Sequence, residues 1–224
     1  MKKGLEKEWD NYWIGKRGKR ESLYDVVAQI YRKLIIKRAL NYFIKREFPK
    51  NSKLLHTGCG SGQVDIDISK IYDITGLDIS KEALKIYAKT GGRKSKTLHA
   101  DISDIPVKDQ SFDGVYNLGV MEHFNKEENQ KNLKEFKRVI KPNGKIILFW
   151  PPVFGISVIF LNSLHFFLNK VLRKNVRLHP EEISLLKSKK DVNTILKKSG
   201  FKMTQFYFGP RDFFTHCIIV AMHK

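Results

Sequence analysis

Short blocks of apolar residues alternate with amphipathic stretches along residues 53–150. Apolar runs bounded by glycine, proline or aspartate predict buried strands, whereas apolar residues at 3.6-residue spacing predict helices. The pattern predicts strands near 53–57, 74–78, 96–100, 112–117 and 145–150, and helices near 62–70, 80–90 and 126–140. Strands that alternate with helices in this way predict an α/β fold with a doubly wound parallel sheet.

The two ends of the chain add further elements to this repeat. Residues 1–20 are polar and predict an arm or a tail, while residues 21–48 have helical periodicity that ends at Pro49. Near the C-terminus, residues 202–209 and 213–222 are predicted to be two strands joined by Gly209–Asp212. The expected organisation is an N-terminal arm and helix over 1–48 and one domain over 49–224.

The first predicted strand runs into a turn with glycine at alternate positions, Gly58, Gly60 and Gly62, and Asp78 ends the second strand. Glycine permits positive φ and lets a ligand approach the backbone closely. The carboxyl ends of neighbouring parallel strands face one crevice, where an acid can hydrogen-bond a ribose diol. A site for a nucleoside-containing cofactor is therefore predicted. Gln63 stands where a dinucleotide site of the form G-x-G-x-x-G needs its last glycine, which disfavours an NAD-dependent oxidoreductase.

The G-x-G-x-G turn with an acid at the next strand end resembles the class I S-adenosylmethionine-dependent methyltransferases of the small-molecule type, with a methyltransferase type 11-like domain. Three later segments are similar to the same family in the same order: His99–Ile102, Ser111–Phe124 and Val139–Trp150. The resemblance implies a Rossmann-like, doubly wound, seven-stranded sheet with a terminal antiparallel hairpin and a helical cap. It also implies S-adenosylmethionine as cofactor and S-adenosylhomocysteine as product.

The resemblance implies a role for each matching position. Asp78 is expected to accept from the ribose hydroxyls, Asp101 from the adenine amine, and Asn117 to close the methionine end of the site. The bland alternatives are a tight turn without a ligand, a helix-capping acid at Asp78, a turn acid at Asp101 and a loop amide at Asn117. The implied cofactor-binding residues are His56, Gly58, Cys59, Gly60, Gly62, Gln63, Asp78, Ile79, Asp101, Ile102, Asn117 and Leu118.

Two histidines carry separate hypotheses. His56 departs from the family, which commonly has an acid at this position to anchor the cofactor's ammonium group. A neutral imidazole can still accept one hydrogen bond. The alternative is that His56 is a buried strand histidine with a backbone partner. His123 lies in the loop where substrate is expected and is the only candidate catalytic base, with a role in the pocket wall as its alternative. Further pocket candidates, each with surface structure as its alternative, are His179 with Glu181 and Glu182, and Arg211 with Asp212.

Composition and charge bear on the partners, the cysteine chemistry and the cellular compartment that are expected for this chain. The chain has 224 residues, 42% of them apolar, and a net charge of +19, which bears on association rather than on fold. Its cysteines, Cys59 and Cys217, suggest neither a disulfide framework nor a metal site. The charged N-terminus lacks the apolar run of a signal peptide, so a reducing cytoplasm is expected. The sequence leaves the oligomeric state open.

Val153–Leu168 carries no formal charge and is followed by Lys170, Arg173, Lys174 and Arg177. As a helix these 16 residues would extend about 24 Å, short of the roughly 30 Å hydrocarbon core of a bilayer. A helical insert at about 153–190 is therefore expected to form a lid or core element, or to rest on a membrane as a peripheral contact.

Three functions follow from these observations. The first is a methyltransferase that acts on a small, hydrophobic or lipid-like acceptor. The second is an RNA-modifying methyltransferase, suggested by the net charge and by the basic cluster Lys16–Arg20. Against it, Asn117-Leu-Gly-Val differs from the Asn-Pro-Pro-Tyr of exocyclic-amine methylases, so no nucleic-acid partner is expected. The third is a non-catalytic cofactor-binding protein of the same fold.

Overall fold

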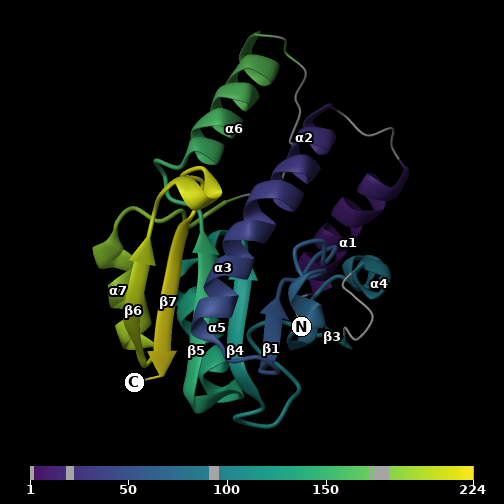
Figure 1. Ribbon diagram of the computed structural model, residues 1–224. Helices are drawn as coiled ribbons and strands as arrows, with labels where there is room; N and C mark the ends of the chain where they lie inside the picture. The colour runs from purple at the N-terminus through teal and green to yellow at the C-terminus, as the bar shows by residue number, and fades with distance from the viewer. Residues whose placement is uncertain (1–2, 19–22, 91–95, 172, 174–181, 224) are drawn as a thin grey trace.

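One seven-stranded sheet forms the centre of the computed structural model, which describes residues 3–18, 23–90, 96–171, 173 and 182–223 (Figure 1). The sheet order is β3-β2-β1-β4-β5-β7-β6, in which β1 to β5 run parallel and β7 is antiparallel to both its neighbours. This confirms the doubly wound sheet and its terminal hairpin. The strands are β1 (Lys53–Thr57), β2 (Asp73–Asp78), β3 (Lys96–His99), β4 (Phe112–Leu118), β5 (Ile140–Trp150), β6 (Phe201–Tyr207) and β7 (Cys217–His223).

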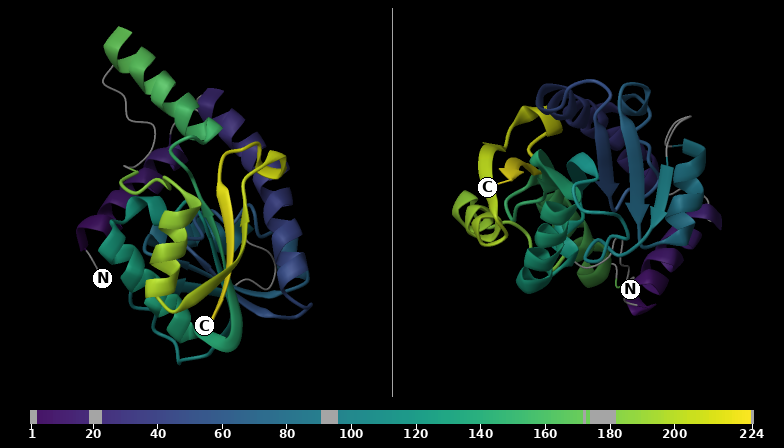
Figure 2. Two further views of the ribbon diagram at one scale, coloured as in Figure 1. Left: turned by 90° about the vertical axis from the view of Figure 1, so that its left-hand side faces the viewer. Right: turned by 90° about the horizontal axis from the view of Figure 1, so that it is seen from below.

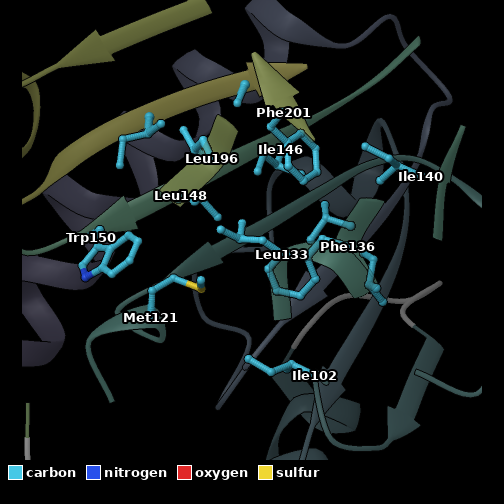
Figure 3. Close-up of a cluster of buried hydrophobic side chains, with 14 of the residues drawn as sticks. Ile102, Met121, Leu133, Phe136, Ile140, Ile146, Leu148, Trp150, Leu196 and Phe201 are labelled. Carbon is cyan, nitrogen blue, oxygen red and sulfur yellow. The ribbon is translucent and has the colours of Figure 1, made fainter. Parts of the chain in front are cut away.

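Helices cover both faces of the sheet (Figure 2). Consecutive strand residues are buried on opposite faces, as in other parallel sheets with helices on both sides, and the buried positions include the polar residues His56, Thr57 and Asn117. Leu54 and Phe149 pack with Phe43 of α3 on one face, whereas Leu55 and Trp150 belong to the cluster that includes α5 and α7 on the other (Figure 3). The α-helices are α1 (Lys3–Gly18), α2 (Leu23–Tyr31), α3 (Lys37–Glu47), α4 (Lys81–Thr90), α5 (Lys126–Val139), α6 (Ile156–Phe166) and α7 (Lys189–Lys198).

Two local expectations were wrong and one is refined. The segment expected to be a helix over 62–70 is a series of turns that ends in the 3₁₀ turn Ile68–Lys70. Its first residue, Gly62, has a φ of 69°, which a right-handed helix does not allow. The helix expected over 21–48 is present without a break from Leu23 to Glu47, with a π-helical turn at Arg32–Ile36 in its middle. The turn expected at Pro142–Gly144 lies inside β5, where the register with β4 shifts.

The insert after β5 is anchored at both of its described ends. It contains α6 and the π-helical turn Phe167–Val171, and its return segment pairs with the chain that leaves β5: the Leu186 N–H donates to Pro151 O at 3.0 Å, and the Val153 N–H to Leu186 O at 3.0 Å. Within the described part of the chain, every helix is too short or too polar to cross a bilayer. His179 and Glu181, two of the expected pocket candidates, lie outside the described residues, as do Lys19, Arg20, Lys174 and Arg177.

Candidate functional site

The glycine turn after β1 needs its glycines for two separate reasons. Gly58, Gly60 and Gly62 have φ of 66°, 52° and 69°, a region that residues with a Cβ rarely adopt. A Cβ on Gly58 would also lie 2.5 Å from Cγ2 of Val120, in the loop after β4. The loops after β1 and β4 therefore meet at Gly58. The Cys59 N–H donates to Leu77 O at 3.0 Å and holds the turn against β2.

Asp78 ties this turn to the end of β2. Its carboxylate accepts from the Gly60 N–H at 2.9 Å through one oxygen and from the Ser80 N–H at 2.9 Å through the other. The side chain is buried, and burial raises the pKa of this carboxyl even though the two N–H donors act to lower it. Asp78 therefore makes the contact of a helix-capping acid, which was the alternative to ribose binding. Because each carboxylate oxygen has a second lone pair, this contact does not preclude a ligand.

The expected adenine contacts lie at the neighbouring strand ends. Asp101, just past β3, is buried, and its carboxylate accepts from the Ser103 N–H at 2.9 Å. This is the contact of a turn acid, which was the alternative to adenine binding. Ile102 is buried in the apolar cluster of Figure 3. The carbonyl of Ile79 pairs with Nε2 of His99 at 2.9 Å, which links the ends of β2 and β3.

Buried amides beside the turn lack partners. Asn117, at the end of β4, is fully buried, and neither its amide oxygen nor its nitrogen has a hydrogen-bond partner among the described residues. The Oε1 atom of Gln63 is also buried without a hydrogen-bond partner among the described residues. A buried amide without a partner is costly, so these atoms indicate a place for a ligand that supplies the missing donors and acceptors. The methionine end of S-adenosylmethionine carries both an ammonium and a carboxylate.

His56 belongs to a buried polar network that sequence reasoning missed. Its Nδ1 lies 2.7 Å from Oδ2 of Asp65, and the Asp65 carboxylate also accepts from the hydroxyls of Tyr87 and Tyr116, each at 2.8 Å. The His56 ring stacks on Tyr116 at a centroid distance of 4.5 Å. His56 thus has a carboxylate partner rather than the backbone partner of its alternative. Asp65 alternates with apolar residues in Val64–Ile68, a pattern that gives no sign of burial.

Helix α1 lies across the carboxyl ends of the strands. The Trp13 indole packs on Gly60, since a Cβ there would lie 2.9 Å from it. The Asp10 carboxylate accepts from the Ser80 hydroxyl at 2.6 Å and from the Glu82 N–H at 3.2 Å. The N-terminal residues expected to form an arm or a tail are therefore a helix that covers the glycine turn.

The loop after β4 places Glu122 and His123 beside α1. The His123 ring meets the Trp9 ring edge to face at 5.2 Å, and its Nε2 lies 3.9 Å from Oε1 of Glu122. Glu122 is only 3% exposed, and its Oε2 has no hydrogen-bond partner in the described residues. Burial raises the pKa of Glu122 to about 8. The backbone carbonyl of Glu122 accepts from the N–H groups of Ile183 and Ser184 and so fixes the return of the insert to this loop.

Arg211 and Asp212 have contacts away from the glycine turn. The Arg211 guanidinium stacks on Tyr42 of α3, 3.7 Å from the ring centroid. The buried Asp212 carboxylate accepts from the His216 N–H at 2.7 Å. The Arg211 stacking fastens the turn between β6 and β7 to α3, whereas the Asp212 hydrogen bond lies within the connection that leads into β7.

Comparisons with known proteins agree with this geometry. Residues 55–148 match the family model described as a methyltransferase domain. The ubiquinone/menaquinone biosynthesis C-methyltransferase UbiE of Geotalea daltonii is 26% identical over 218 residues, 84% of this chain and 89% of that protein. An uncharacterized protein of Methanocaldococcus jannaschii is 33% identical over 189 residues, 81% of this chain and 82% of that one.

A solved structure extends the similarity to the whole fold. Magnesium protoporphyrin IX methyltransferase of Synechocystis, with bound S-adenosylhomocysteine, superposes with a TM-score of 0.72 at 15% identity and full coverage of both chains. The chain belongs to the class I S-adenosylmethionine-dependent methyltransferases.

Proposed function

We propose that this protein transfers the methyl group of S-adenosylmethionine to a small, apolar acceptor. The proposal rests chiefly on one observation: the glycine turn, the carboxylate of Asp78 and the unpartnered amide of Asn117 converge at the carboxyl ends of β1, β2 and β4. Methyl transfer from a sulfonium needs binding and alignment more than it needs protein nucleophiles. The named relatives add support, since UbiE is named for quinone biosynthesis and the Synechocystis enzyme for a porphyrin.

Each part of the site has a proposed task. The glycine turn holds the methionine and ribose part of the cofactor, Asp78 the ribose hydroxyls, and Asn117 the methionine end. Trp9 of α1 and the loop with His123 form the wall of the acceptor site. His123 is the proposed general base where the acceptor needs to lose a proton. A cytoplasmic location is part of the same proposal.

Calorimetry with S-adenosylhomocysteine tests the cofactor site. Asp78→Asn keeps the size of the side chain but removes the charged acceptor, so we expect binding roughly ten- to a hundredfold weaker than in wild type. Asp73→Asn is the matched control, because Asp73 begins the same strand and pairs with Lys96 at 2.9 Å near the surface. Equal affinity in both variants would contradict the assigned site.

Transfer of a tritium-labelled methyl group tests the acceptor class. The purified protein is incubated with labelled cofactor and a cell extract, and the label is counted in the organic-soluble and RNA fractions. We expect incorporation into organic-soluble small molecules that is lost in the Asp78→Asn variant. Label in the RNA fraction alone would favour the RNA-modifying alternative, and binding without incorporation in any fraction would favour the non-catalytic one.

A further inference from the structure

Helices α2 and α6 lie at the end of the molecule where the parallel strands finish (Figures 1 and 2). Both helices have exposed apolar side chains. The term apolar end surface is used here for six side chains that are 50% to 60% exposed: Val27, Ile30, Ile159, Phe160, Phe167 and Phe213. Three belong to α6 or the turn that follows it, two to α2, and one to the turn between β6 and β7. Exposed apolar groups gathered in this way indicate an interaction site.

The turn between β6 and β7 joins the two helices into one surface. The Ile156 N–H, at the start of α6, donates to Phe214 O at 3.0 Å. The Tyr31 hydroxyl, at the end of α2, donates to Asp212 O at 3.0 Å. In the same turn Phe213 and Phe214 have φ of 59° and 56°. Bulky residues rarely adopt positive φ. Such strained residues persist only where the surrounding structure enforces them, and they are concentrated at functional sites.

The charged residues next to the apolar end surface indicate the kind of partner that suits it. Residues 153–173 and 26–38 contain no aspartate or glutamate, although acids are common elsewhere in the chain. Lys170 and Arg173 follow α6, Arg32 and Lys33 follow α2, and all four are exposed. Uncovered apolar side chains followed by bases without acids match an anionic lipid surface, which takes apolar groups below its headgroups and cations at them.

We propose that the apolar end surface docks the protein on the face of an anionic phospholipid bilayer. The contact is peripheral, because the exposed side chains of α6 extend over only a few turns. The proposed cofactor site lies at the ends of the same parallel strands, so docking holds it next to the lipid. The proposal stands apart from methyl transfer, since its test measures vesicle binding and no turnover.

Cosedimentation with vesicles tests the docking. Wild-type protein is mixed with vesicles of phosphatidylcholine plus phosphatidylglycerol, and with vesicles of phosphatidylcholine alone. We expect clear binding only to the first. The Phe160→Ser/Phe167→Ser variant should bind at least about tenfold more weakly, because two aromatic groups no longer leave water. Circular dichroism of each variant establishes that the exposed substitutions leave the fold intact.

A charge variant and its control separate docking from general attraction. Lys170→Gln/Arg173→Gln should weaken binding roughly thirtyfold, which corresponds to ~1 kcal/mol for each base near an anionic surface. Lys197→Gln/Lys198→Gln, at the exposed end of α7, removes the same charge elsewhere and should leave binding close to wild type. Equal losses in the two charge variants would overturn the proposal, as would binding that survives the phenylalanine substitutions. A lipid-free dimer that those substitutions convert to a monomer would also overturn it, because a second copy would then cover the surface.

Discussion

At the scale of single residues, Glu122 is an acid that the fold keeps protonated. Burial raises its pKa from 4.5 to about 8, and the nearby charge of Glu182 also raises it. The unfolded chain releases this proton near pH 4.5 while the folded chain retains it to about pH 8. The folded state therefore binds more protons across this window, and the free energy of unfolding must fall as pH rises through it.

The variant Glu122→Gln should remove that fall. The amide stays neutral, so the free energy of unfolding at pH 8 should exceed that of wild type by several kcal/mol, at ~1.4 kcal/mol per unit of pKa shift. The two proteins should converge near pH 4.5. Urea denaturation across this range measures the difference. Parallel pH profiles for the two proteins would show that the carboxylate is ionised in the folded state.

Glu47 is a useful control because its pKa moves in the opposite direction. Partial burial acts to raise it, but hydrogen bonds from Arg46 and Lys145 lower it overall. Its contribution to stability is present above the unfolded pKa and is lost as pH falls through the lower folded value. Glu47→Gln should therefore alter the acid side of the profile and leave the slope between neutral pH and pH 8 unchanged.

At the scale of elements, a side chain of helix α1 accepts hydrogen bonds at the N-terminus of helix α4 and so serves as part of its cap. One oxygen of Asp10 accepts from the Ser80 hydroxyl and the Glu82 N–H at the start of α4, where the helix dipole favours a negative charge. Glu6 adds a contact to Nε2 of His99 at 3.3 Å. These polar contacts orient α1 so that Trp13 rests on Gly60.

Asp10→Ala should therefore loosen α1 without unfolding the sheet. Loss of about 1.4 kcal/mol of hydrogen bonding would raise amide hydrogen exchange in α1 by roughly tenfold, measured by mass spectrometry on peptides from α1. Glu8→Ala, an exposed position on the same helix, should leave exchange close to wild type. If both variants exchange at the same rate, the contacts of Asp10 do not hold the helix.

Sequence pattern predicted the elements that depend on local signals. Short apolar runs such as Leu54–Leu55 and Ile146–Phe149 mark strands of the parallel sheet, and Ser80 marks the start of α4, where its hydroxyl accepts from the Ala83 N–H. Helix α1 was missed because its side chains rest on the loops after β1, β2 and β4 and on His99 at the end of β3, all of which are distant in the sequence. Asp65 was missed for a similar reason, since His56, Tyr87 and Tyr116 surround it only after the chain has folded.

At the scale of the whole molecule, the net charge of +19 acts on stability and on docking in opposite directions. Repulsion among like charges destabilises the compact state, while the same charge attracts an anionic bilayer. The surface ion pairs, such as Lys141 with Asp113 at 2.6 Å, each contribute only about 0–1 kcal/mol. Repulsion should therefore dominate the response of the folded state to salt.

Raising the ionic strength from about 0.01 M to 0.15 M shortens the screening length from roughly 30 Å to 8 Å. We expect the free energy of unfolding, measured with urea, to rise over this range while binding to phosphatidylglycerol vesicles falls. Lys197→Gln/Lys198→Gln lowers the net charge by two and should reduce the gain in stability, yet leave the salt dependence of docking close to wild type. Stability that falls with added salt would mean that the ion pairs outweigh the repulsion. Docking that does not respond to salt would mean that the apolar end surface binds lipid without help from its bases.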